Sequence, residues 1–167
     1  MQALWGVYFY GSAWLVLLIL CFAAVLKLRR RGEFLSALAG YQLLPEVGLR
    51  FWWLLPVLEL LAVFELLFSV GASRWLALLL FLLYGAAIMI NLLRGRRDID
   101  CGCGGDDTPI GWGLVLRNLV LAGLALPQQV PAQDLMYLGN ALTFAAVAFG
   151  LLSYGISNQL FANSARG

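Results

Sequence analysis

Long apolar segments separated by short polar ones run through almost the whole chain. Several are about 17–22 residues long, enough for a helix to cross a hydrocarbon core of roughly 30 Å. Together they cover approximately residues 6–26, 51–70, 75–93, 110–126 and 135–156. The pattern predicts an all-α integral membrane protein, a bundle of about five transmembrane helices that forms a single membrane domain over residues 1–167.

A shorter amphipathic stretch follows the first apolar segment. Phe34, Leu38 and Tyr41 recur at helical spacing over approximately residues 31–44, and Pro45 comes directly after them. About a dozen residues are too few to span the bilayer. We therefore expect a short interfacial or re-entrant helix here, with a plain cytoplasmic turn as the alternative.

The composition agrees with this class. The chain is 62% hydrophobic and 12% charged, with a mean hydropathy of +0.86. Soluble domains carry charge on about one-quarter of their residues, so this chain has the composition of a membrane protein. We expect a lipid bilayer, and no nucleic acid, among its partners.

Lysine and arginine are distributed unevenly between the two predicted sides of the membrane. One side holds nine of them: Lys27, Arg29, Arg30, Arg31, Arg50, Arg94, Arg96, Arg97 and Arg166. The other side holds only Arg74. The positive-inside rule predicts a multi-pass protein of the bacterial inner membrane with its N-terminus outside and residues 94–108 at the cytoplasmic face.

The loop at residues 94–108 carries the most reactive side chains of the chain. Cys101 and Cys103 are separated only by Gly102, and a bridge between cysteines at this spacing is geometrically possible. Such a small ring should be strained and easily reduced, which suits a cycling disulfide. Arg94 and the arginines beside it would favour a thiolate, whereas Asp100 would oppose it. We interpret the two cysteines as a candidate catalytic thiol–disulfide pair of an oxidoreductase or of its accessory.

Two other functions stay open for this loop. The chain has three cysteines and no histidine, which excludes zinc sites that use imidazole. Two thiolates could still hold a soft cation such as Cu(I) or Hg(II), so soft-metal binding or transport is one alternative. A non-catalytic assembly scaffold for a thioredoxin-like partner is the other, and inert loop thiols are the simplest explanation of all.

Several polar residues inside the apolar segments lie on the side of the membrane that carries this loop. Glu59 and Arg117 each lie about eight residues, or roughly 12 Å, from the same face, so we predict that they form an ion pair. Asn118, Asn91 and Cys21, a candidate third thiol, lie near this face as well. They would form a polar pocket that positions a partner cysteine or a redox carrier; a salt bridge that only fixes helix packing is the alternative. Glu65 lies deeper, without an obvious partner.

The order of motifs over roughly residues 1–127 resembles the methylamine utilisation protein MauE family, which is related to the DoxX-like membrane proteins. The resemblance rests on Lys27 and Arg29, on Phe34, Leu38, Tyr41, Leu44 and Pro45, on Pro56 and Glu59, on Asn91, Arg94, Gly95 and Arg96, on Asp100-Cys-Gly-Cys-Gly104, and on Trp112, Arg117 and Asn118. Gly105 stands where the family usually has an aromatic residue.

The resemblance implies a four-helix DoxX-like core followed by a C-terminal helix. It also implies a membrane component that supports maturation of the methylamine dehydrogenase small subunit, an exported, disulfide-rich protein, together with a thioredoxin-like partner of the MauD type. A quinone could border Phe51, Trp52 and Trp53, although interfacial anchoring also explains these aromatic residues. Because disulfides form outside the cytoplasm, a cytoplasmic dithiol implies either electron transfer across the membrane or an exception to the charge rule.

Overall fold

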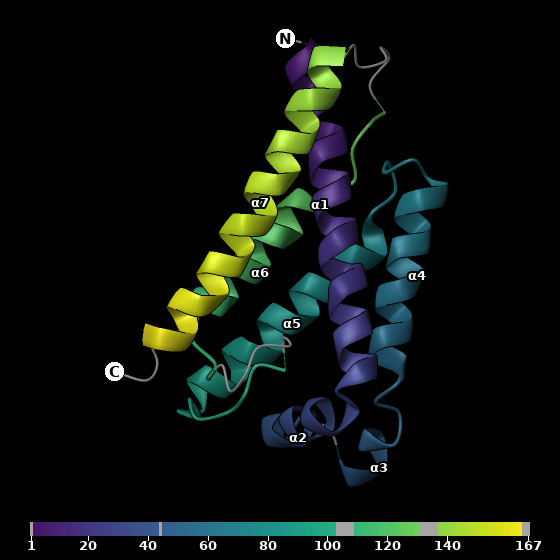
Figure 1. Ribbon diagram of the computed structural model, residues 1–167. Helices are drawn as coiled ribbons and strands as arrows, with labels where there is room; N and C mark the ends of the chain where they lie inside the picture. Colours follow the sequence, from purple (N-terminus) through teal and green to yellow (C-terminus); the bar gives the residue numbers. More distant parts are fainter. Residues whose placement is uncertain (1, 44, 103–108, 131–136, 165–167) are drawn as a thin grey trace.

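The computed structural model describes residues 2–43, 45–102, 109–130 and 137–164 (Figure 1). Within these ranges the secondary structure is helical, as the sequence predicts, and its elements are α1 (Gln2–Arg29), α2 (Arg31–Tyr41), α3 (Glu46–Leu49), α4 (Leu54–Phe68), α5 (Trp75–Leu93), α6 (Trp112–Leu124) and α7 (Tyr137–Ser164). The protein is therefore an all-α membrane protein.

The helices differ in their ability to cross a bilayer. Among the described residues, three spans are long and apolar enough: Leu4–Arg29 in α1, Trp75–Leu93 in α5 and Gly139–Leu160 in α7. Helices α4 and α6 have 15 and 13 residues, or roughly 20 Å each at 1.5 Å per residue, and are shorter than the apolar segments predicted for them. Part of the difference arises because residues 51–53 form a turn, so α4 begins only at Leu54.

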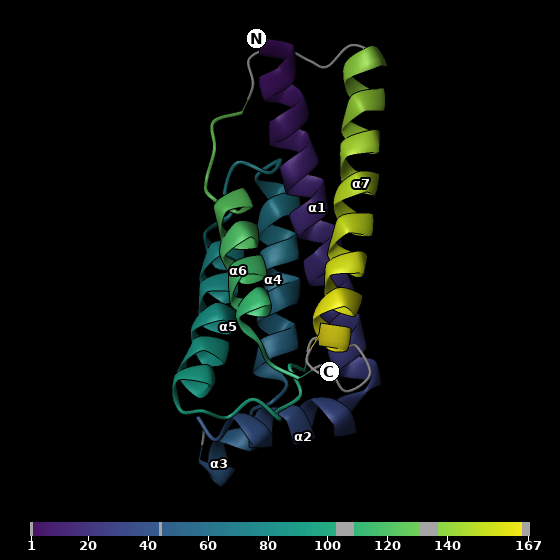
Figure 2. The ribbon, with the colours of Figure 1, turned by 90° about the vertical axis from the view of Figure 1, so that its left-hand side faces the viewer.

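Helix α1 lies at the centre of the bundle. Helices α4 and α7 pack along it, while α5 and α6 pack against each other as an antiparallel pair (Figures 1 and 2). Buried apolar side chains of α1, α4, α5 and α6 form the main core, among them Val16, Leu20, Leu66 and Leu80. Helix α2 crosses one end of the bundle, where the segment between α5 and α6 also lies (Figure 2). This end holds the site described below.

Helix α7 continues beyond the apolar segment that predicts it. The hydropathy falls after residue 156, yet the helix extends to Ser164. Asn158 in this extension accepts a hydrogen bond from the Arg117 guanidinium of α6. A Cβ atom on Gly150 would lie 2.8 Å from the Leu15 side chain of α1, which agrees with the close packing that small residues allow.

Glu65 has partners that the sequence does not reveal. Its carboxylate accepts hydrogen bonds from the Ser73 hydroxyl at 2.5 Å and from the backbone N–H groups of Trp75 and Leu76 at 3.2 and 3.0 Å. None of these partners is evident from the sequence alone. The turn between α4 and α5 returns the chain beside Glu65, which then caps the N-terminus of α5 with a negative charge.

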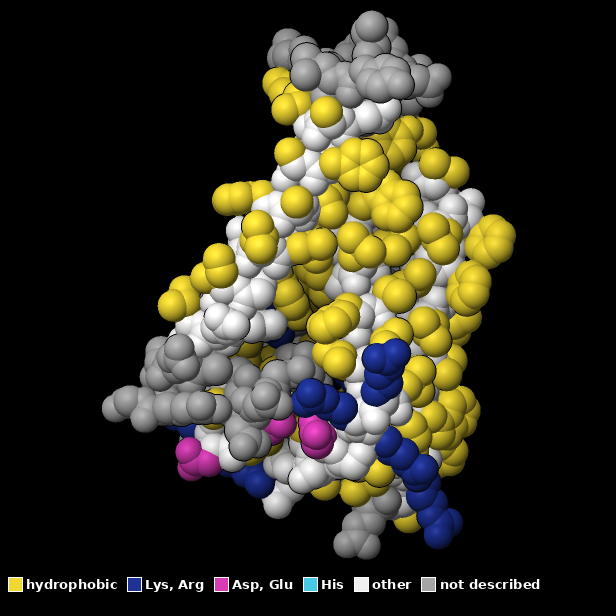
Figure 3. Space-filling view, viewed as in Figure 1, with side chains coloured by type: hydrophobic (Ala, Val, Ile, Leu, Met, Phe, Trp, Pro, Cys, Tyr) yellow, Lys and Arg dark blue, Asp and Glu magenta, His cyan; other side chains and the backbone are white. Residues whose placement is uncertain are grey.

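The charges are concentrated at the end of the bundle near α2. Figure 3 shows lysine and arginine side chains gathered there, while hydrophobic side chains cover most of the remaining face. Arg74, the one basic residue predicted on the opposite side, has no exposed surface. Its guanidinium donates hydrogen bonds to the carbonyls of Phe9, Gly71 and Leu124 at 2.6–2.9 Å and to the Ser12 hydroxyl at 2.7 Å. Arg74 thus ties α1 and the end of α6 to the α4–α5 turn.

Replacement of Arg74 by lysine should destabilise the fold by about 2 kcal/mol, because an ammonium keeps the charge but cannot reach all these acceptors at once. Unfolding of the purified protein in detergent, followed by tryptophan fluorescence, measures this effect. The matched control is Arg50→Lys at an exposed position, which should change stability by less than about 0.5 kcal/mol. Equal stability of the two variants would contradict the role assigned to Arg74.

Candidate functional site

Cys101 lies in the segment between α5 and α6 and is almost buried. Its exposed fraction is 9%, and it packs in an apolar cluster with Ile88, Ile99 and Leu114. Cys101 takes part in a disulfide, whereas Cys21 is a free thiol. Cys103 lies outside the described residues. The structure therefore places the first cysteine of the motif against the helices and away from bulk water.

Tyr41 at the end of α2 holds the backbone beside Cys101. Its hydroxyl donates a hydrogen bond to the Cys101 carbonyl at 3.2 Å. Burial, with a smaller contribution from the negative charge of Asp100, raises the pKa of Tyr41 well above its ordinary value. The hydroxyl consequently stays protonated, and remains a donor, over the physiological pH range.

The backbone around Cys101 is further fixed on both sides. Asp100 and Pro109 form an isolated antiparallel bridge, and the Ile110 N–H donates to the Ile99 carbonyl at 2.9 Å. Gly102 has a φ of +66°, which favours glycine, and its N–H donates to the Asp100 carboxylate at 3.2 Å. Gly102 therefore closes a defined turn directly after Cys101.

Alanine at Gly102 should be poorly tolerated. A Cβ atom there would lie 3.2 Å from the Cβ of Ala37 in α2, in addition to the backbone strain. We expect a loss of about 1–2 kcal/mol and a change in how readily Cys101 is reduced. Gly95→Ala is the matched control, because Gly95 also has a positive φ, +74°, but no neighbour within 4 Å. If both variants lose the same stability, the contact between residue 102 and α2 does not contribute to the loss in the Gly102 variant.

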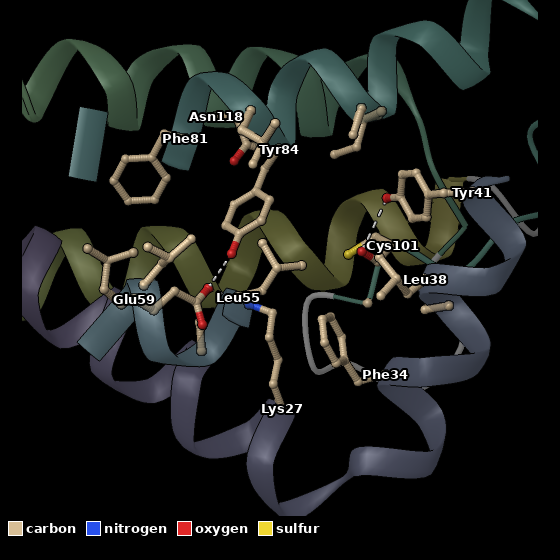
Figure 4. A pocket seen from close by; sticks show the side chains of 18 of the residues that line it. Lys27, Phe34, Leu38, Tyr41, Leu55, Glu59, Phe81, Tyr84, Cys101 and Asn118 are labelled. Carbon is tan, nitrogen blue, oxygen red and sulfur yellow. Dashed lines mark hydrogen bonds and ion pairs between the residues drawn. The ribbon is translucent and has the colours of Figure 1, made fainter. Parts of the chain in front are cut away.

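A cavity of about 500 Å³ lies beside Cys101, within the range of small-molecule sites (Figure 4). All the helices of the bundle contribute to its wall, and most of the lining side chains are apolar. In Figure 4 the Cys101 side chain projects into this space, with Tyr41 and Phe34 on its own side and Glu59 and Tyr84 across from it. The site is therefore an apolar chamber with a sulfur in its wall.

The polar end of the cavity is a buried ion pair. Lys27 at the end of α1 binds Glu59 of α4, and the exposed fractions of the two side chains are 9% and 0%. The Tyr84 hydroxyl of α5 donates to the same carboxylate oxygen, Oε1, at 2.8 Å. The Lys27 ammonium also lies 5.0 Å from the Tyr84 ring centroid and 5.7 Å from that of Phe34. Glu59 Oε2 is buried and has no hydrogen-bond partner among the described residues.

The predicted ion pair between Glu59 and Arg117 is wrong. Both residues line the cavity. Glu59 nevertheless binds Lys27, while Arg117 donates to Asn158 and lies 5.1 Å from the Tyr154 ring centroid, both on α7. Depth along a helix does not determine its neighbours: α4 packs against α1, and α6 packs against α5.

The other candidate residues are distributed around the cavity. Asn118 lines it and donates to the Leu114 carbonyl at 2.8 Å. Asn91 is fully buried in α5 and donates to the Ala87 carbonyl at 3.1 Å, but it does not line the cavity, and neither does Cys21. Arg94 is exposed just after α5. The predicted convergence of all these residues therefore does not extend to Cys21 or Asn91.

Sequence reasoning did not predict Tyr84 and Lys27 as site residues. Tyr84 carries the one hydroxyl group of its apolar segment. A buried tyrosine hydroxyl needs a hydrogen-bond partner, and this requirement could have indicated that Tyr84 belongs to a polar site. Lys27 appears in the sequence analysis as a charge at the membrane face and as part of the family resemblance, but not as a site residue. Of the aromatic residues after α3, Phe51 and Trp52 line the cavity, and the Arg31 guanidinium lies 4.9 Å from the Trp52 ring centroid.

Fold and site together define a helical membrane protein with a disulfide-bonded cysteine at an apolar cavity. Residues 4–127 match the family description "Methylamine utilisation protein MauE". The chain belongs to the MauE family.

Individual relatives agree with this assignment. The chain is 43% identical over 122 residues to a methylamine utilization protein MauE of Paracoccus denitrificans, 45% over 119 residues to one of Methylophilus methylotrophus, and 40% over 151 residues to one of Methylorubrum extorquens. These alignments cover 66%, 66% and 85% of this chain. They span 65%, 62% and 81% of the respective relatives. No solved structure matches the chain.

Proposed function

We propose that this protein is a membrane accessory of methylamine utilisation and that it carries out thiol–disulfide exchange at Cys101 and Cys103. Membership of the MauE family supports the accessory role. The observation that carries the chemistry is Cys101 itself, which is disulfide-bonded and fixed by Tyr41 beside the cavity. A soft-metal site would need both sulfurs as thiolates, so the disulfide favours redox chemistry over metal binding.

The exchange transfers two electrons and two protons. The disulfide between Cys101 and Cys103 breaks, two thiols of the partner become a disulfide, and the motif becomes a dithiol; the reverse reaction uses the same groups. The proposed partner is a thioredoxin-like protein, and the proposed final substrate is an exported, disulfide-rich protein. Cys101 is nearly buried. We therefore propose that the thiolate of the partner attacks the sulfur of Cys103 and that Cys101 is the inner cysteine of the pair.

We propose that the α2 end faces the cytoplasm of the bacterial inner membrane. Exposed arginines gather at this end, and the one arginine of the other side is buried in the fold. Electrons then have to pass across the membrane to connect this face with an exported substrate. A cysteine introduced as Arg94→Cys should react with a membrane-impermeant maleimide only in opened cells. Labelling of this cysteine in intact cells would contradict the proposed orientation.

Complementation tests the accessory role and the chemistry separately. A Methylorubrum extorquens strain that lacks its MauE protein should regain growth on methylamine when it expresses this chain. The double variant Cys101→Ser/Cys103→Ser should not restore growth, although it should be present in the membrane at normal amounts. Failure of the unmodified chain would contradict the methylamine role, and rescue by the double variant would favour the assembly scaffold over thiol chemistry.

A further inference from the structure

We infer that the cavity binds the head group of a membrane quinone and that this quinone exchanges electrons with the cysteine pair. The redox part rests on the proposed function, whereas the binding site rests on the cavity alone. Its wall is apolar apart from a few polar side chains, and its volume of about 500 Å³ suits a substituted ring with the start of an isoprenoid tail. An apolar chamber inside a membrane protein favours a ligand that partitions into lipid.

The burial of Cys101 limits what can react with it. Cys101 is only 9% exposed, so it offers little surface to the thiol of another folded protein, whereas its side chain projects into the cavity (Figure 4). A small reactant inside the cavity can therefore reach a sulfur that is little exposed to a protein partner. A dithiol and its disulfide differ by two electrons and two protons, and quinone and quinol are lipid-soluble carriers that differ by the same number.

The polar end of the cavity supplies hydrogen bonds to such a head group. Glu59 is fully buried, and its Oε2 atom has no partner among the described residues, so it can accept a hydrogen bond from a quinol hydroxyl. Lys27 has three N–H donors, and one of them serves Glu59, so another can donate to a quinone carbonyl. A buried unpartnered carboxylate oxygen is costly in an apolar wall unless a ligand completes it.

The electron balance of the step is closed. In the oxidising direction, the two cysteine S–H bonds break and one S–S bond forms. The two electrons and two protons pass to the quinone, whose two carbonyl oxygens become the O–H groups of the quinol. The partner dithiol of the proposed exchange then supplies the next two electrons, so one quinone is reduced for each disulfide formed in the partner.

Binding of decylubiquinone to the full-length protein in phospholipid nanodiscs tests the site without relying on the cysteines. Quenching of tryptophan fluorescence should saturate with the unmodified protein and equally with Cys101→Ser. Glu59→Gln should weaken binding of the reduced form, decylubiquinol, about tenfold or more under anaerobic conditions, because it removes the charged acceptor of a quinol hydroxyl. Glu65→Gln is the matched control on the same helix and should bind like the unmodified protein. Ala23→Phe, which places a ring in the cavity without touching the ion pair, should also weaken binding.

The redox step is measured on the same samples. Pre-reduced protein, mixed anaerobically with decylubiquinone, should form about one quinol per protein, and Cys101→Ser should bind the quinone but form none. Quenching that never saturates, or that is as strong in Ala23→Phe and Glu59→Gln as in the unmodified protein, would show only partition into lipid and would overturn the inference. Binding without quinol formation would overturn its redox part. Loss of exchange with a thioredoxin-like protein, with binding and quinol formation intact, would instead contradict the proposed function.

Discussion

Cys101→Ser is expected to lower the rate of thiol–disulfide exchange with a thioredoxin-like protein by at least about a hundredfold, because no serine oxygen can form or break a disulfide. The fold should survive, since serine fits the space of the sulfur and Tyr41 still bonds the backbone carbonyl at this position. Exchange can be followed with purified protein in nanodiscs by maleimide trapping of the partner's thiols.

Cys21→Ser is the matched control for this prediction. Cys21 is a free thiol on α1 and does not line the cavity, so the variant should exchange at the rate of the unmodified protein. Equal exchange rates in the Cys101 and Cys21 variants would show that Cys101 takes no part in the exchange. A loss of rate in the Cys21 variant alone would move the reactive thiol to α1.

Glu59→Gln is expected to destabilise the protein by about 3–5 kcal/mol, because it leaves the Lys27 ammonium buried without its counter-charge. The double variant Lys27→Met/Glu59→Gln removes both charges and should be more stable than Glu59→Gln alone. Chemical unfolding in detergent, with tryptophan fluorescence as the signal, gives the free energies of the unmodified protein, Glu59→Gln, Lys27→Met and the double variant.

Glu33→Gln provides the matched control on a surface pair. Glu33 and Arg30 lie 3.4 Å apart with side chains that are 65% and 44% exposed, so their attraction is screened by water. This variant should lose less than about 1 kcal/mol. If the double variant at Lys27 and Glu59 loses as much stability as the sum of its single changes, the two residues do not interact in the folded protein.

The helical class and the end of the bundle that carries the site could be predicted from the sequence. Apolar segments of spanning length predict membrane helices whatever their neighbours are, and the basic residues with the Cys101 motif mark one face. Counting residues along two helices predicts a similar depth for Glu59 and Arg117. Both residues line the same cavity.

The pairing of the buried polar groups could not be predicted, because it depends on which helices are neighbours and how each is rotated. Glu59 meets Lys27 because α4 packs on α1, and Arg117 meets α7 instead. Arg74 is the sharper example: in sequence it is a lone charge between two helices, yet it is fully buried and satisfied by carbonyls from distant segments. Hydropathy describes each helix separately and contains no information on such contacts.

A redox titration of Cys101 tests the central claim most directly. Native membranes are equilibrated in glutathione or dithiothreitol buffers of known potential, quenched with acid, and treated with a maleimide that reports the Cys101 thiol by mass spectrometry. The account predicts one reversible two-electron transition between roughly −180 and −320 mV, the range of cycling disulfides, and its loss in Cys103→Ser. A Cys101 that stays disulfide-bonded at every potential, or titrates unchanged without Cys103, would contradict the account.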